Sequence, residues 1–178
     1  LTGGSLQMSS SATYTDNGNR IGSQTDTRGQ TVSYAYGSEI SRMLGQPTAV
    51  TDSNGVTVNT SYNSSNGRTA GSSMSGISID YGYSNGRLTS MTRTVNSNAQ
   101  SYYLGYNGFG QMTSVQVGSR SLTGYTYAAN DGLLSRMTYS SGDTVDYDYD
   151  DLERVKNIFY NNSDSPAYTY NYMGEGTL

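Results

Sequence analysis

The chain has 178 residues, including 18 Tyr and 22 Gly, and it contains no Trp, Cys or His. Only 13% of its residues are charged, and a net charge of −4 argues against a nucleic-acid-binding protein, which needs basic residues to neutralise phosphates. No apolar run approaches the roughly 20 residues of a membrane helix. Without His or Cys, the usual catalytic triads, imidazole bases, thiol nucleophiles and zinc sites are excluded.

Tyrosines recur along the chain at an almost constant interval of about 22 residues, the signature of a repeat protein. The tyrosines that end successive strand-like segments are Tyr14, Tyr36, Tyr62, Tyr83, Tyr106, Tyr127, Tyr149 and Tyr170. Another tyrosine lies two positions before five of them, at Tyr34, Tyr81, Tyr125, Tyr147 and Tyr168. We therefore predict about eight repeated units.

Each unit begins with an alternating strand and a tight turn. In residues 144–150, Val145, Tyr147 and Tyr149 fall on one face and three aspartates on the other, the pattern of a half-buried strand. Asn, Asp and Gly follow the second tyrosine, because a tight hairpin requires residues that tolerate positive φ. The predicted turn glycines are Gly18, Gly45, Gly67, Gly86, Gly110 and Gly132.

The second strand of each unit has a different spacing. Apolar residues lie three apart in the pairs Pro47/Val50, Leu88/Met91, Met112/Val115, Leu134/Met137 and Val155/Ile158. This spacing breaks strict alternation and predicts a β-bulge or a sharp twist. A helix is the competing interpretation, but these segments are short and rich in Ser, Thr and Gly. Second turns, as in 52–55 and 140–143, close the units.

The predicted fold is therefore all-β, with tandem antiparallel hairpins forming one long sheet of about sixteen strands. So wide an open sheet rarely stays flat, and we expect it to curve or spiral. We expect a single β-domain over residues 1–178, belonging to a longer chain or assembly.

Three segments carry a family resemblance. Residues 147–155 (YDYDDLERV) resemble the YD repeat, in which Tyr-x-Tyr-Asp is followed after two residues by Gly-Arg-Leu; Glu153 takes the place of the glycine. Residues 81–88 (YGYSNGRL) are a shortened copy, and residues 106–112 (YNGFGQM) keep the full spacing with Gln for Arg. The unit that includes residues 37–45 is stretched. The chain thus resembles the RHS/YD-repeat family over essentially its whole length.

The resemblance implies a sheet that spirals into a hollow shell with tyrosines along it. Such shells enclose toxic C-terminal domains of secreted bacterial proteins, or form extracellular barrels in teneurin-like adhesion proteins. It implies a non-catalytic, secreted or cell-surface bacterial protein, whose partners are further segments of its own chain, further copies, or an enclosed cargo. The self-cleaving core segment that ends many family shells is not found, so autoproteolysis is not expected.

The acidic residues suggest two alternatives that we consider weaker. Asp146, Asp148, Asp150, Asp151 and Glu153 form an acidic cluster that could serve as a glycosidase pair or a calcium site. The strand period alone explains these positions, with Asp150 at the turn, and carboxylates in a strand diverge. We expect no catalytic residues, no metal and no cofactor.

The tyrosines themselves allow two interpretations. They could bind sugars or peptides as an adhesion module, since an aromatic ring with a polar tip suits a wet interface. Because they recur in every unit, we favour a packing ladder across neighbouring strands. A third hypothesis is a filament subunit, because neither terminal hairpin carries the Lys and Pro that protect an exposed edge.

Overall fold

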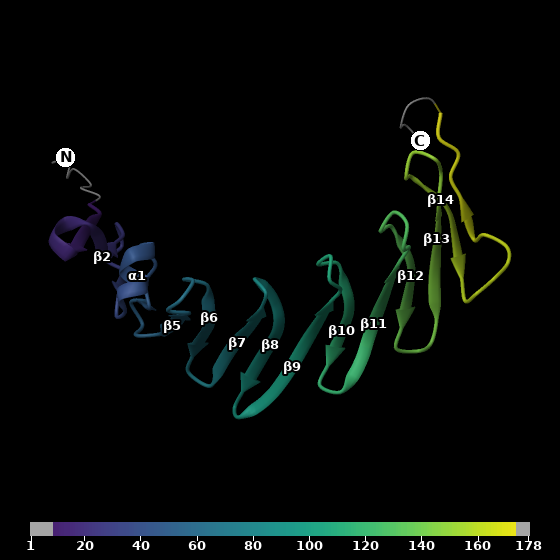
Figure 1. The fold of residues 1–178 in the computed structure, drawn as a ribbon. Coiled ribbons are helices and arrows are strands. Elements are labelled where there is room, and N and C mark those ends of the chain that lie inside the picture. The colour runs from purple at the N-terminus through teal and green to yellow at the C-terminus, as the bar shows by residue number, and fades with distance from the viewer. Residues whose placement is uncertain (1–8, 174–178) are drawn as a thin grey trace, which may run out of the picture. The chain divides into compact units, whose positions relative to one another are not determined.

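The computed structural model describes residues 9–173, which form an almost entirely β structure with one short α-helix (Figure 1). The strands are β1 (Ser11–Thr15), β2 (Arg20–Thr25), β3 (Thr31–Ala35), β4 (Ala49–Thr51), β5 (Thr57–Tyr62), β6 (Thr69–Met74), β7 (Ile77–Ser84), β8 (Arg87–Val95), β9 (Asn98–Tyr106), β10 (Met112–Val117), β11 (Arg120–Tyr127), β12 (Leu134–Tyr139), β13 (Thr144–Tyr149), β14 (Val155–Tyr160) and β15 (Tyr168–Thr169). The predicted all-β hairpin fold is confirmed, with fifteen strands in the described part of the chain where about sixteen were expected.

The strands form one open sheet in which they follow one another in chain order, β1 to β15 (Figure 1). Neighbouring strands run antiparallel, as in the pairs β4/β5 and β13/β14. The chain divides into two compact units: residues up to 82 with 91–99, and residues 83–90 with those from 100 onward. The single domain expected over 1–178 stays a prediction.

The bulge predicted in the second strands is confirmed at Met112/Val115, Leu134/Met137 and Val155/Ile158, whereas the prediction is wrong for β4, which contains Val50 and pairs without a register shift. Met112 pairs with Tyr106, Leu134 with Tyr127 and Val155 with Tyr149, and in each case the register then skips one residue. The same shift occurs opposite Tyr14 and Tyr62. The extra residue explains the three-residue apolar spacing, because it restores the side-chain face after the skip.

The stretched unit contains a helix that the sequence analysis did not predict. Helix α1 (Glu39–Leu44) begins after Ser38, whose side chain accepts a hydrogen bond from the Ser41 N–H. Gly45 ends it with φ of 66°, in the left-handed conformation typical of a glycine cap. Gly45 thus has the predicted positive φ but closes a helix instead of a hairpin.

The two faces of the sheet differ in composition within each unit. One row across β11–β14 joins Tyr125, Met137, Val145 and Tyr160. On the opposite face, a row across β9–β13 joins Gly105, Ser114, Gly124, Thr138 and Thr144. The first unit has an equivalent small-residue row of Thr13, Ser23, Ser33, Thr51 and Thr57.

A conventional hydrophobic core is absent from the described residues. None of their hydrophobic side chains is buried; of the polar ones, Ser41 and Thr144 are. A single sheet layer cannot cover its own apolar face, so these residues must be held mainly by contacts between neighbouring strands. Across residues 9–173, no helix is long and apolar enough to cross a membrane, and helix α1 has only six residues.

Candidate functional site: contacts that join neighbouring hairpins

A recurring five-residue turn connects strands in both compact units of the chain. In the first example, the Asp26 N–H donates to the Gln30 carbonyl at 2.9 Å, and the Gly29 N–H donates to the Asp26 carbonyl at 3.0 Å. The Asp26 Oδ1 atom accepts two further backbone bonds, from Arg28 and Gln30, each 2.9 Å long. This side chain therefore satisfies turn donors that would otherwise need water.

The same turn is built on Asp52, Asn107 and Asp150. Each side-chain Oδ1 accepts backbone N–H groups two and four residues later, at 2.9–3.0 Å. The fourth residue of the turn has positive φ, as at Gly110 (86°). At the Asp150 turn this position is Glu153, with φ of 61°. A non-glycine residue in this conformation is strained by roughly 1–2 kcal/mol.

The second tyrosine of a unit reaches back to the hairpin before it. Its hydroxyl donates to the backbone carbonyl of a residue 15–18 positions earlier. We call this contact the tyrosine–carbonyl bond. It joins Tyr36 to Ile21 (3.3 Å), Tyr62 to Pro47 (3.0 Å), Tyr106 to Leu88 (2.9 Å), Tyr127 to Met112 (2.7 Å), Tyr149 to Leu134 (2.9 Å) and Tyr172 to Val155 (2.8 Å).

Four of the six acceptors, Ile21, Met112, Leu134 and Val155, lie at bulges. Leu134 pairs with Tyr127 across its own hairpin and accepts the hydroxyl of Tyr149 from the next one. Met112 pairs with Tyr106 and accepts from Tyr127 in the same way. A bulge disrupts the strand ladder locally, and the tyrosine hydroxyl supplies a donor there. In each of these six cases, one bond thus joins a hairpin to its predecessor.

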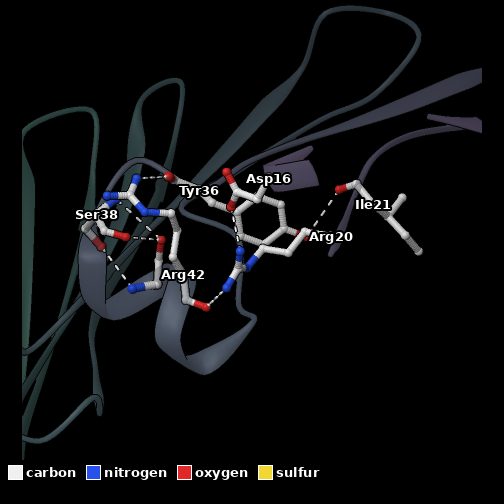
Figure 2. A network of polar contacts seen from close by, with 7 residues as sticks. Asp16, Arg20, Ile21, Tyr36, Ser38 and Arg42 are labelled. Carbon is white, nitrogen blue, oxygen red and sulfur yellow. Dashed lines mark hydrogen bonds and ion pairs between the residues drawn. The ribbon is translucent and has the colours of Figure 1, made fainter. Parts of the chain in front are cut away.

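An arginine reinforces this contact near the N-terminal end. Arg20 forms an ion pair with Asp16 at 2.5 Å, and its guanidinium lies 5.7 Å from the centre of the Tyr36 ring. It also donates to the carbonyl of Arg42 in helix α1, while Arg42 Nη1 donates to the Tyr36 carbonyl at 3.1 Å. Figure 2 shows that these groups form one network around the Tyr36 ring.

A second arginine is used in the same way near the C-terminal end. Arg154 bonds to the Asp150 carboxylate through Nε at 2.7 Å and Nη2 at 2.6 Å. Its guanidinium lies 4.2 Å from the centre of the Tyr172 ring, whose hydroxyl bonds to the next residue, Val155. Arg154 therefore contacts the ring of the same tyrosine whose hydroxyl bonds to the first residue of β14.

Two other units use the position of this arginine in a related way, one with glutamine and one with arginine. Gln111 Nε2 donates to the Gly132 carbonyl in the next turn at 2.7 Å, and Gln111 Oε1 accepts from Asn107 at 2.8 Å. Arg87 lies against Gly110 so closely that a Cβ at residue 110 would meet its guanidinium. In these two units a long polar side chain at this position therefore reaches the following turn.

Electrostatics favour the protonated tyrosine and the charged aspartate. Burial raises the pKa of the Tyr62 and Tyr149 hydroxyls, so both remain hydrogen-bond donors. The Arg154 side chain lowers the pKa of Asp150, with backbone N–H bonds acting in the same direction against desolvation. The pKa of Asp26 is lowered mainly by its bond from the Gln30 N–H.

The predicted tyrosines fall into several groups. Five of the eight spaced tyrosines make the tyrosine–carbonyl bond, but in the last unit Tyr172 makes it in place of Tyr170. Tyr34 donates to Gln24 across the strand pair, and Tyr147 to the sulfur of Met137. Tyr81 and Tyr83 lie in β7, Tyr125 in β11, and Tyr14, in edge strand β1, is 61% exposed.

The packing ladder expected of these tyrosines stays a prediction. Several of the hydroxyls bond to backbone carbonyls, and the rings of Tyr160 and Tyr168 meet edge-on. The sequence marks both partners without joining them. The tyrosine period gives the donors, and the apolar pairs of the second strands begin at five of the six acceptors, Pro47, Leu88, Met112, Leu134 and Val155, but neither pattern shows that the two groups bond. The turn glycines Gly18, Gly45, Gly67, Gly86, Gly110 and Gly132 all have positive φ.

The acidic residues do not converge. Asp146 pairs with Arg136 at 2.5 Å across β12 and β13, whereas Asp150 holds the turn described above. Within residues 9–173, no group of three acidic, His or Cys side chains is placed to hold a metal ion. Asp146 therefore links two neighbouring strands, and Asp150 stabilises a turn between strands.

Comparison with known proteins bears on the fold alone. No family model matches the chain, and no curated protein matches it by sequence. Solved structures do: a TcdB2–TccC3–Cdc42 complex is 15% identical with a TM-score of 0.60 over 90% of this chain. The Photorhabdus luminescens Tc holotoxin pore with a TccC3 mutation is 16% identical, with a TM-score of 0.61 over 85% of this chain. A TcdB2–TccC3–TEV complex is 17% identical, with a TM-score of 0.60 over 85% of this chain. This chain spans 9% of the length of each.

Proposed function

We propose that this chain is a non-catalytic wall segment of a longer, secreted or cell-surface bacterial protein of the RHS/YD-repeat type. The observation that carries the proposal is the tyrosine–carbonyl bond, which recurs from Tyr36 to Tyr172 and joins successive hairpins. The fold of the sheet is similar to that of Tc toxin chains, of which this chain spans 9% of the length. This similarity supports the proposal independently of the YD motifs.

The proposed mechanism is geometric. Each hairpin is bonded to its predecessor by a backbone ladder, one hydroxyl bond and, in some units, an arginine or glutamine. Stability then depends on nearest neighbours, so a wall can be extended without a large core. The enclosed cargo that the family resemblance implies, a hazardous C-terminal domain, would lie behind such a wall.

The test uses the complete protein in which this segment occurs. Tyr127→Ala and Tyr149→Ala together remove two successive tyrosine–carbonyl bonds, and Tyr103→Ala is the control because Tyr103 is 45% exposed. We expect limited proteolysis to reach downstream cargo at least ten times faster in the double variant than in the control. Equal cleavage rates, with cargo open to protease in all proteins, would contradict enclosure.

Assembly through the edge is the second candidate. All five residues of edge strand β1 are exposed, and none is Lys or Pro. Such an edge can pair with a second copy and produce filaments. Light scattering and negative-stain imaging distinguish the two proposals: fibres that disappear when Ala12→Pro blocks the edge support assembly, whereas a monomer at all concentrations excludes it.

A further inference from the structure

Tyr139 and Tyr160 are two of the five tyrosines that lie outside the recurring set. Tyr139 and Tyr160 are the last residues of β12 and β14, and they are 41% and 45% exposed. The equivalent last residues of β6 and β10 are Met74 and Val117. The repeat period therefore does not account for two aromatic side chains at this place.

The two tyrosines line one shallow pocket. Strand β13 lies between β12 and β14, which places the tyrosine-bearing strands roughly 9–10 Å apart. Val145, Tyr147 and Ile158 also line the pocket, and Asp143 and Asn161 add polar groups. Its volume of about 380 Å³ lies within the range of small-molecule sites.

Several contacts fix the side chains of this pocket before any ligand arrives. The Tyr160 ring meets Tyr168 edge-on, with centroids 6.2 Å apart. Asn161 Oδ1 accepts from the Thr144 N–H at 2.9 Å, which orients the amide and leaves its NH₂ group to donate. Asp143 accepts from the Ser141 hydroxyl at 2.6 Å through one carboxylate oxygen. Such preorganisation reduces the entropy lost on binding.

The charge and polarity of the lining restrict the ligand. No lining residue is basic and one is a carboxylate, so phosphates, sulfates and uronic acids are disfavoured. Aromatic rings with polar tips, next to a carboxylate acceptor and an amide donor, match a ligand with an apolar face and a hydroxyl-bearing edge. Burial, with Tyr139, Tyr149 and Tyr160 nearby, raises the pKa of Tyr147, so its phenol remains neutral.

We propose that the pocket between Tyr139 and Tyr160 binds one neutral pyranose ring of a glycan. The sugar C–H face lies against the tyrosines, and its hydroxyls bond to the carboxylate of Asp143 and the amide of Asn161. The site does not depend on the wall function proposed above, since it uses side chains that the recurring contacts leave out.

The experiment titrates the whole protein with methyl α-D-glucopyranoside, methyl β-D-galactopyranoside and N-acetylglucosamine, with glucuronate as the anionic comparison. Ligand-observed NMR and tyrosine fluorescence, which no tryptophan obscures, report binding. We expect at least one neutral probe to bind and glucuronate to bind at least ten times more weakly.

Variants locate the site. Tyr160→Ala and Tyr139→Ala should each weaken binding at least tenfold, and Asp143→Asn severalfold, whereas Tyr139→Phe and Tyr160→Phe keep the rings and should lose little. Tyr103→Ala, which removes an equally exposed tyrosine outside the pocket, should change nothing. Circular dichroism checks that each variant folds. The proposal is overturned if no neutral probe binds, if glucuronate binds best, or if Tyr103→Ala weakens binding as much as Tyr160→Ala.

Discussion

The two arginine-covered tyrosines, Tyr36 and Tyr172, use the same parts in different surroundings. At Tyr172, Arg154 is 4.2 Å from the ring centre and the hydroxyl bond is 2.8 Å long. At Tyr36, Arg20 is 5.7 Å from the ring centre and the bond is 3.3 Å long. The Tyr36 contact is looser, but Arg20 also reaches the Arg42 carbonyl in helix α1.

The difference shows which part of the contact is constant. The hairpin that supplies the acceptor differs, with helix α1 between Tyr36 and Pro47 but only a short turn between Tyr106 and Met112, yet Tyr62 and Tyr127 both bond to a residue 15 positions earlier. Around Tyr172 the spacing is 17. The constant element is thus the hydroxyl bond to the carbonyl, whereas the turn within the hairpin that supplies the acceptor varies from a short turn to helix α1.

The largest expected effect comes from removing the rings. Tyr172→Ala and Tyr36→Ala lose the ring, its arginine contact and the hydroxyl bond, and each should reduce local stability by about 2 kcal/mol, below the fully buried range because the rings are half-buried. Hydrogen exchange of amides in the adjoining hairpins measures this. We expect Tyr172→Ala to cost more; a larger loss at Tyr36 would show that the helix network outweighs the closer contact.

Removing only the hydroxyls isolates the bonds. Tyr172→Phe should cost about 1 kcal/mol of local stability, and Tyr36→Phe roughly half as much because its bond is longer. The same exchange measurement applies, with Tyr103→Phe as the control. If the two Phe variants match the control, the hydroxyl bonds contribute nothing and the strand ladder alone holds the hairpins.

The Asp150 turn should gain stability from glycine. Glu153→Gly relieves left-handed strain at φ of 61° and loses some chain entropy, so we expect a net gain of about 0.5–1 kcal/mol. The reciprocal change is Gly142→Ala, at φ of 92° with no neighbour within 4 Å of a new Cβ, which should lose about 1 kcal/mol. Urea unfolding measures both, and a loss on Glu153→Gly would mean that the glutamate makes a compensating contact.

Acid should loosen the C-terminal contact through Asp150. Because its folded-state pKa lies below the ordinary 3.8, the stability it contributes is complete above pH 3.8 and is lost as pH falls through the lower folded value. Exchange in β13 and β14 should therefore accelerate below pH 3.8 in the wild type and less so in Asp150→Asn. An unchanged acid response in the variant would assign the effect to other carboxylates, such as Asp26.

Sequence reasoning predicted the features that depend on local pattern. Alternation at Val145, Tyr147 and Tyr149 indicated β13, and three-residue spacing at Met112/Val115 indicated the bulge. Helix α1 also had a local signal that was not used, a serine cap at Ser38 and a glycine at Gly45. The apolar pairs also marked acceptors such as Met112 and Leu134, but the bond itself and the use of Tyr172 depend on how a tyrosine lies against the preceding strand, which the spacing does not encode.

The direction of the tyrosine–carbonyl bond has a consequence for synthesis. In each of the six contacts the donor lies 15–18 residues later in the chain than its acceptor. Because a ribosome releases the N-terminal part of a chain first, the segment with the acceptor carbonyl leaves the exit tunnel and can fold before the tyrosine that donates to it emerges. Such short sequence separations also favour rapid folding. The wall can therefore grow one unit at a time, in the order in which it is translated.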